Sequence, residues 1–165
     1  MASIVLFHNQ KNIFSKIIEL FQDSPISHCG IGLTINGLPY VLHAAFLGVA
    51  FAPRDHLLQT HTIVAEFAIV PNVDAELMQA AEKYIGDSYD TFGLIGFLFV
   101  LLGRKIKRTI KNPFASKNAL VCSELIVDAD IDHLIPEFTG LVPEDTMPID
   151  IYNICSNGKS FIRLT

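Results

Sequence analysis

The chain has 165 residues, half of them hydrophobic, and a formal net charge of −5. This length predicts one domain, and this hydrophobic content supplies a core without disulfides. Three cysteines without framework spacing exclude a disulfide scaffold and favour a reducing compartment. The negative charge excludes a general attraction to nucleic acid. The first residues show no basic segment and no small-residue cleavage site, so we expect no signal peptide and a cytoplasmic protein.

Hydrophobic patterning predicts strands first and helices later, an order typical of the α+β class. Asn12 is a candidate N-cap of the first helix, and Ser24-Pro25 is expected to end it. Asn36-Gly37 between two extended runs predicts a β-hairpin. The predicted strands span residues 3–8, 28–35, 38–45, 48–52, 62–70 and 160–164, and the predicted helices span 13–22, 74–86, 90–103 and 119–130. The remainder of the last 30 residues is expected to be irregular.

The predicted hairpin would bring two histidines together. If residues 36 and 37 form the turn, paired positions sum to 73, which places His43 opposite Gly30. Side chains alternate along a strand, so His28 and His43 become diagonal neighbours on one face, about 7–8 Å apart at Cα. Such a pair suits a catalytic base and the polar group that orients it. The alternative is two ordinary packing histidines, and a register slip of one residue would move one of them to the other face.

Cys122 lies in the predicted helix over residues 119–130, with Asn118 as its candidate N-cap. The helix dipole and the unpaired N–H groups of a first turn favour a thiolate and can bind an oxyanion during acyl transfer. The alternative is a buried, inert cysteine. Cys29 alternates away from His28 and is expected to be a small buried residue. Glu124 is expected to cap locally or to be exposed, without a catalytic role.

The sequence becomes strongly basic after an apolar run at residues 92–102. That run is too short to span a bilayer, which needs about 20 apolar residues. One interpretation is a buried helix followed by a solvated loop, and the other is contact with an anionic lipid surface or an acidic partner. The basic loop, residues 104–111, contains Arg104, Lys105, Lys107, Arg108 and Lys111.

Four short motifs together resemble one family. They are Ser27–Leu33 (SHCGIGL), Val41–Ala44 (VLHA), Gly86–Asp90 (GDSYD, followed by Gly93) and Val121–Leu125 (VCSEL). With them the chain resembles the circularly permuted papain-like thiol hydrolases, which include permuted NlpC-type cell-wall peptidases and the lecithin:retinol acyltransferase relatives. The histidine motif precedes the cysteine motif, which is the permuted order. The opening strand, the helix after it and the Ser-Pro break resemble the bacterial and phage branch, and the similarity covers roughly residues 3–150.

This resemblance implies an α+β, circularly permuted papain-like fold over residues 1–165, in which an antiparallel sheet packs against the helix that carries the cysteine. It implies that Cys122 is the nucleophile, His28 the base and His43 the third polar group. Relatives often carry an acidic residue at the third position, so His43 is closer to the acyltransferase pattern. Tyr89 and Asp90 match a motif that lies near the cleft in relatives, which implies a substrate-side or structural role.

The predicted function is therefore a cysteine-dependent hydrolase or acyltransferase that acts on an amide or ester bond through an acyl-enzyme. The substrate would be a peptide, as in cell-wall stems, or a lipid ester, and no cofactor is expected. A phage-encoded protein would work in the host cytoplasm or the virion. One alternative is a non-catalytic binding or host-interaction module on the same fold. Another is a metal site of His28, His43 and Cys122, although their spacings of 15 and 79 residues match no zinc pattern.

The other histidines and the third cysteine have no partner motif. They are expected to be surface or packing residues, and they are His8, His56, His61, His133 and Cys155.

Overall fold

The computed structural model describes residues 1–9, 13–45, 47–70, 72–90, 96, 99–100, 102–103, 105–108, 110–113, 119–130 and 134–165, with the backbone alone at 13, 14, 21 and 119. It combines a six-stranded antiparallel sheet with helices, so the predicted α+β class is confirmed.

The central sheet has the strand order β4-β3-β2-β1-β5-β8, and each neighbouring pair is antiparallel. β1 lies inside the sheet and is buried on both faces, which explains why its sequence is a continuous apolar run. All six strands agree with the sequence prediction to within one residue at each end. They are β1 (Ser3–Asn9), β2 (His28–Ile35), β3 (Leu38–Ala45), β4 (Gly48–Pro53), β5 (His61–Ile69) and β8 (Phe161–Arg163).

β2 and β3 form the predicted hairpin. Asn36 and Gly37 both have positive φ angles, 52° and 80°, as a two-residue turn that follows the twist of the strands requires. The register pairs Ile35 with Leu38 and continues without a shift, so paired positions sum to 73 as predicted. The face on which each hairpin side chain lies is thereby fixed.

The described helices flank the sheet and fill the connections between strands. They are α1 (Ile13–Gln22), α2 (Arg54–Leu57), α3 (Asp74–Glu82), α5 (Cys122–Ala129) and α6 (Pro148–Asn157), with short 3₁₀ turns at Pro136–Phe138 and Pro143–Asp145. Most of the predicted helix over 90–103 and both candidate N-caps, Asn12 and Asn118, lie outside the described residues.

Each face of the sheet has its own core. The larger core includes Cys29 of β2, Leu77 of α3, Leu125 of α5 and Ile151 of α6, so these three helices cover one face. On the other face, Leu57 of α2 closes a small cluster with Val5, Phe7 and Val41. Side chains alternate along β2, and His28 pairs with Phe7, so Cys29 belongs to the first face and His28 to the second.

Several parts of the chain differ from the prediction. The cysteine helix begins at Cys122 and not at residue 119, because Ala119–Leu120 forms a short strand, β7, that pairs in parallel with β6 (Ser88–Tyr89). The expected irregular tail contains α6, whose proline at the first position and whose Asp150 bond to the Met147 N–H are helix-start signals. α3 also ends four residues earlier than predicted.

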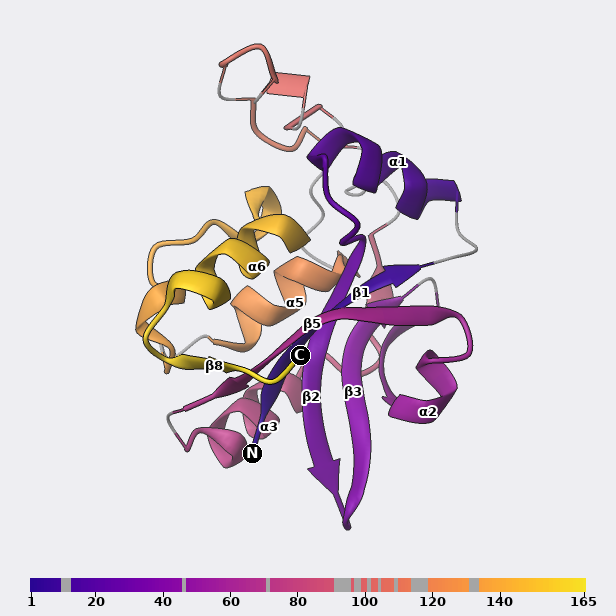
Figure 1. Cartoon of the computed structure of the whole chain (residues 1–165), viewed down its shortest axis with the longest axis vertical. Helices are drawn as coiled ribbons and strands as arrows, with labels where there is room; N and C mark the ends of the chain where they lie inside the picture. Colours follow the sequence, from indigo (N-terminus) through magenta and orange to yellow (C-terminus); the bar gives the residue numbers. More distant parts are fainter. Residues whose placement is uncertain are drawn as a thin grey trace.

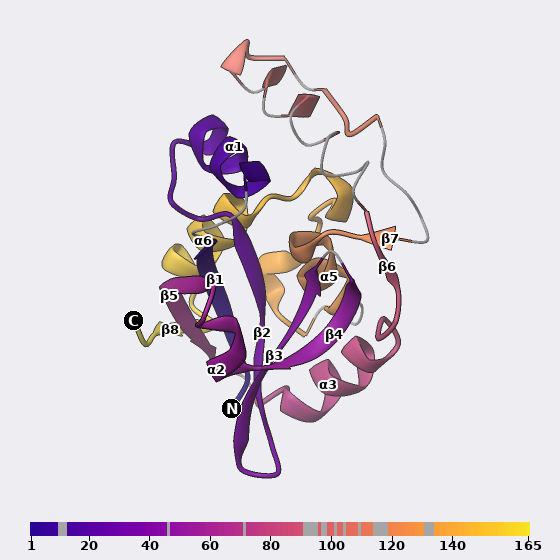
Figure 2. The same cartoon turned by 90° about the vertical axis from the view of Figure 1, so that its right-hand side faces the viewer.

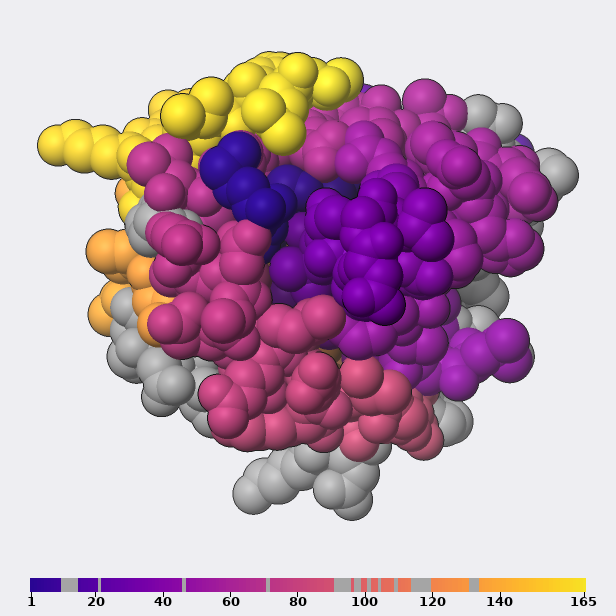
Figure 3. All heavy atoms as spheres, turned by 90° about the horizontal axis from the view of Figure 1, so that it is seen from below, coloured from indigo at the N-terminus to yellow at the C-terminus, as the bar shows by residue number. Residues whose placement is uncertain are grey.

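The two ends of the sheet have different neighbours (Figure 1, Figure 2). The tip of the β2–β3 hairpin lies at one end, and the start of β2 lies at the other, below α1. Figure 3 looks onto the hairpin end, where the first residues of the chain lie beside its C-terminal segment. This agrees with the pairing of β8 on β5, next to β1. Among the described residues, none of the helices has the length and apolar character needed to cross a membrane.

Candidate active site

The two predicted histidines are in direct contact at the end of the sheet below α1. Nε2 of His28 lies 2.9 Å from Nδ1 of His43, and the two rings meet edge to face with centroids 5.2 Å apart. Gly30 makes this contact possible, since a Cβ there would lie 2.6 Å from the Val41 side chain and 3.2 Å from His43 Cβ. The hairpin register therefore places the imidazoles as the sequence predicts.

His43 is held as a neutral imidazole. Its residue is only 7% exposed, and burial, with the nearby His28 and His61 rings, lowers its pKa to about 3. With His43 neutral, Nε2 of His28 and Nδ1 of His43 share one hydrogen bond, and the tautomers of the two rings decide which nitrogen donates. This leaves Nδ1 of His28 as the nitrogen available for proton transfer.

A third histidine, His61, stands against the pair, although the sequence predicts only a packing or surface role for it. Its ring centroid lies 5.4 Å from that of His28 and 5.8 Å from that of Phe7. Its Nδ1 lies 3.2 Å from the Leu57 carbonyl, and its Nε2 lies 3.0 Å from the amide nitrogen of Asn9. The carbonyl requires a proton on Nδ1, so Nε2 accepts from the Asn9 amide. Burial and His28 lower the pKa of His61, which favours this neutral form.

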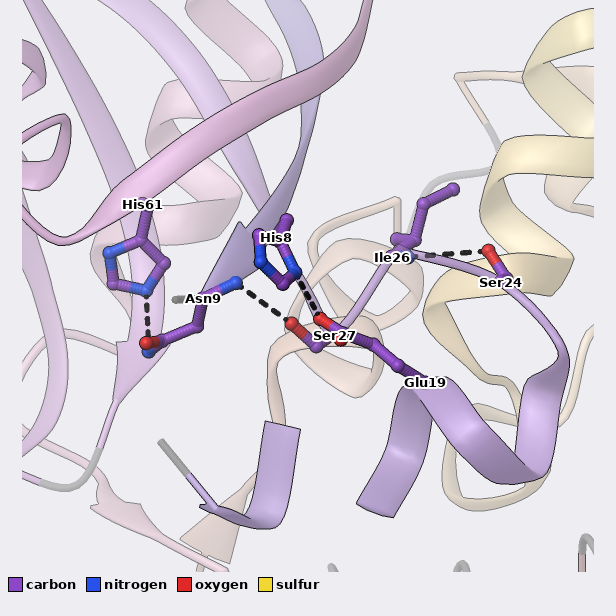
Figure 4. A network of polar contacts seen from close by, with 7 residues as sticks. All are labelled: His8, Asn9, Glu19, Ser24, Ile26, Ser27 and His61. Carbon is purple, nitrogen blue, oxygen red and sulfur yellow. Dashed lines mark hydrogen bonds and ion pairs between the residues drawn. The ribbon is translucent and has the colours of Figure 1, made fainter. Parts of the chain in front are cut away.

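A polar network ties this corner of the sheet to α1 (Figure 4). The Asn9 backbone N–H donates to the Ser27 hydroxyl over 3.1 Å, next to His28 in the chain. His8 Nδ1 lies 2.6 Å from the Glu19 carboxylate on α1. These bonds fix the ends of β1 and β2 that carry Asn9 and His28.

Cys122 is the first residue of α5 and lies beside both Cys29 and His28. A hydrogen bond from the Cys29 thiol, together with the adjacent His28 imidazole and the Cys29 backbone N–H, holds the pKa of Cys122 well below its usual range although burial opposes this. Burial and the neighbouring Cys122 raise the pKa of Cys29 well above its usual range. Cys29 is buried as predicted, but it also contacts the nucleophile candidate, which the sequence did not indicate.

The start of α5 is fixed by buried polar contacts. The Glu124 carboxylate accepts the Val121 N–H over 2.8 Å, and the Ser123 hydroxyl donates to the Thr146 carbonyl over 2.7 Å. Glu124 is buried, which excludes the exposed position considered from sequence. Burial, together with Asp90 and Asp128, raises its pKa to about 8. The first N–H groups of the helix, including that of Cys122, have no acceptor within the helix itself.

Tyr89 and Asp90 lie next to this helix start. Tyr89 pairs with Leu120, and the Asp90 N–H donates to the Leu120 carbonyl over 3.2 Å. Tyr89 packs against Val121, while burial and the nearby Cys122 thiol raise its pKa. Tyr89 therefore lies near the cysteine, and Asp90, which is buried, lies beside Leu120 and near Glu124.

The geometry brings Cys122, His28 and His43 together in the order thiol, imidazole, imidazole. It is the arrangement that a thiol nucleophile, a base and a third group orienting the far nitrogen of that base would require. Within the described parts of the chain, no group of three or more His, Cys, Asp or Glu side chains is placed to hold a metal ion. Cys155, by contrast, is buried in α6, where burial raises its pKa.

The sequence matches no protein-family model and no curated protein. Among solved structures, the chain is similar to the crystal structure of metalloprotein yiiX from Escherichia coli O157:H7, DUF1105, with 17% sequence identity and a TM-score of 0.66. The alignment covers 100% of this chain and 96% of that one. The two proteins therefore share an overall fold.

Proposed function

We propose that the protein is a thiol hydrolase or acyltransferase with a circularly permuted papain-like fold, which cleaves an amide or ester bond through an acyl-enzyme. Cys122 is the nucleophile, His28 the base and His43 the residue that orients His28. The observation that carries this proposal is the chain of contacts from the Cys122 thiol through His28 to Nδ1 of His43. Three free, buried cysteines suit a reducing compartment, so we place the protein in the cytoplasm.

In the acylation step, the Cys122 thiolate attacks the carbonyl carbon of the substrate, and the carbonyl oxygen becomes negatively charged. The N–H groups at the start of α5 are oriented to stabilise that oxyanion. The bond to the leaving amine or alcohol then breaks, and Nδ1 of protonated His28 gives its proton to the leaving group. Cys122 is left as a thioester.

In the deacylation step, His28 takes a proton from water or from an acceptor alcohol or amine, which attacks the thioester carbon. The thiolate of Cys122 leaves, and the acid, ester or amide is released. His43 stays neutral throughout and keeps the His28 ring in one orientation. Tyr89 lies near the reacting sulfur and Asp90 lies beside the start of α5, which suits a role on the substrate side or in holding the site together.

The first test measures the rate of Cys122 alkylation by iodoacetamide across pH 4–9, with Cys155→Ser as background. We expect reaction well below pH 8 in the parent, and we expect His28→Ala to remove the low-pH reactivity. Cys29→Ala removes one stabilising contact to the thiolate, so the pH profile of alkylation should move to higher pH, and each unit by which the Cys122 pKa exceeds the assay pH lowers the thiolate fraction about tenfold. A Cys122 that titrates like a free thiol in every variant contradicts the proposal.

The second test looks for the acyl-enzyme. The parent protein is mixed with p-nitrophenyl acetate, an activated ester, and the intact mass is followed with time. We expect one acetyl group on Cys122, lost again by hydrolysis, and no labelling in Cys122→Ser. His43→Gln should slow both steps and leave the site of labelling unchanged, because its role is orientation.

A non-catalytic binding module on the same fold is the second candidate, favoured by the burial of the site. Cys122 is 6% exposed and His43 is 7% exposed. If Cys122 reacts with iodoacetamide only after unfolding, this second candidate becomes the better account. Because the structural neighbour is called a metalloprotein, elemental analysis of the purified protein is the matching test for a bound metal.

A further inference from the structure

Described residues of the connection between β6 and β7 turn an apolar face outward. Its described residues near 99–105 are helical. Phe99, Leu102 and Ile106 are spaced by three and four residues, so they lie along one side of these turns. They are 44%, 47% and 54% exposed. A helix of a globular protein ordinarily buries such a stripe against its core.

An adjacent side of the same turns is anchored. Val100 and Gly103 are buried, and a Cβ at Gly96 would overlap the Asn112 side chain. The Asn112 backbone N–H donates to the Asp145 carboxylate over 3.1 Å. The inward side is therefore already used for packing, and the apolar stripe faces away from the protein.

Basic residues surround the end of the stripe. The Arg108 N–H donates to the Gly103 carbonyl over 2.8 Å, and Lys107 has a φ of 56°, so the helical turns end here in a left-handed residue. Lys105, Lys107 and Arg108 are all exposed. Because the whole chain carries a net charge of −5, this positive charge is a local feature.

This segment lies at the same end of the molecule as α1 and the start of β2, and opposite the hairpin tip (Figure 1, Figure 2). α1 adds an exposed apolar side chain there, since Leu20 is 71% exposed, with exposed Lys16 one turn before it. A flat partner that touched this end would therefore lie near the end of the sheet that carries His28.

We propose that the outward face formed by Phe99, Leu102 and Ile106, with Lys105, Lys107 and Arg108, binds the surface of an anionic lipid bilayer. The apolar side chains would enter the interface, and the cations would meet acidic headgroups. A second copy docked on the same face would oppose like charges, so charge complementarity favours the acidic lipid. This inference goes beyond the proposed function and holds whether or not Cys122 performs chemistry.

The test is co-sedimentation of the Cys122→Ser protein with vesicles of phosphatidylcholine alone or mixed with phosphatidylglycerol. We expect binding to the mixed vesicles that weakens with salt. Each exposed cation contributes about fivefold in affinity, so Lys107→Gln with Arg108→Gln should bind about 25-fold more weakly. Leu102→Ser with Ile106→Ser should lose about tenfold or more, because two apolar side chains no longer enter the interface.

The matched controls are Leu38→Ser, an exposed leucine at the hairpin end, and Lys159→Gln, an exposed lysine elsewhere. Both should bind like the parent, and circular dichroism should show that all variants are folded. Equal binding to neutral vesicles, or equal binding by the Lys107/Arg108 variant, would overturn the proposal. The proposal would also be overturned if the parent protein does not bind vesicles but forms a dimer in sedimentation velocity, and the Leu102/Ile106 variant is monomeric. That result would assign the face to contact with a second copy of the chain.

Discussion

At the scale of single residues, the site depends on one imidazole that stays neutral. His43 is buried against the His28 ring, and burial, with the nearby His28 and His61, lowers its pKa to about 3. Its ordinary value is 6.5, so between these two pH values the unfolded chain binds a proton that the folded protein does not bind. Folding stability must therefore fall as the pH is lowered through this window.

We expect His43→Gln to remove this pH dependence. Between pH 7 and pH 4 the parent should lose about 3 kcal/mol more of its free energy of unfolding than the variant loses. Urea denaturation at the two pH values measures this difference. His56→Gln is the control, because His56 is exposed and should leave the parent's pH dependence unchanged. Parallel pH profiles for the parent and His43→Gln would mean that His43 is protonated in the folded protein.

At the scale of the element, the exact start of α5 sets where the Cys122 sulfur lies relative to His28. A helix from residue 119 would place Cys122 inside the first turn, whereas the observed helix begins with it. The shift follows from Glu124, which accepts the Val121 N–H, and from the pairing of β7 with β6. The sequence around Glu124 contains the capping acid, but nothing in it predicts the distant partner strand.

Glu124 gives this helix start its own pH dependence. Its pKa is raised to about 8, so stability is lost as the pH rises from 4.5 through 8, when the buried carboxyl must ionise. We expect Glu124→Gln, which keeps an acceptor oxygen, to match the parent at pH 6 and to exceed its stability by roughly 2 kcal/mol at pH 9. Glu124→Ala should be less stable by about 1–2 kcal/mol at pH 6, since it lacks the cap. Thermal unfolding at both pH values tests this, and a parent that gains stability at pH 9 relative to Glu124→Gln would contradict it.

At the scale of the whole molecule, the features that can be predicted from the sequence are those that depend on short periodic patterns. The six strands and the His28–His43 contact follow from alternation and from one two-residue turn. The position of His61 does not follow, because the β1–β5 register shifts between Leu6 and Phe7 and thereby places His61 opposite Asn9. The contact of Cys29 with Cys122 depends on how α5 packs across β2, which no local pattern encodes.

One buried ion pair joins several parts of the fold behind the site. Arg54 of α2 donates to both Glu66 carboxylate oxygens over 2.8 and 2.6 Å, and Ser3 of β1 donates to the same carboxylate over 2.9 Å. The Glu66 carbonyl accepts the Leu164 N–H near the end of the chain. The Arg54 guanidinium, with Ser3, lowers the pKa of Glu66, so this stability is present at neutral pH and is lost as the pH falls through the folded value.

Removing only the cation should therefore harm the fold more than removing both charges. We expect Arg54→Met to lower the free energy of unfolding by about 3–5 kcal/mol, because it removes the cation that compensates the buried Glu66 carboxylate and leaves it the Ser3 hydroxyl bond. Arg54→Met combined with Glu66→Gln should recover at least half of that loss and should be less sensitive to acid than the parent. Lys83→Met, at an exposed lysine, is the matched control and should stay within about 0.5 kcal/mol. If the single and double variants are equally unstable in urea, the loss comes from the packing of the arginine stem across α2 and not from an uncompensated charge.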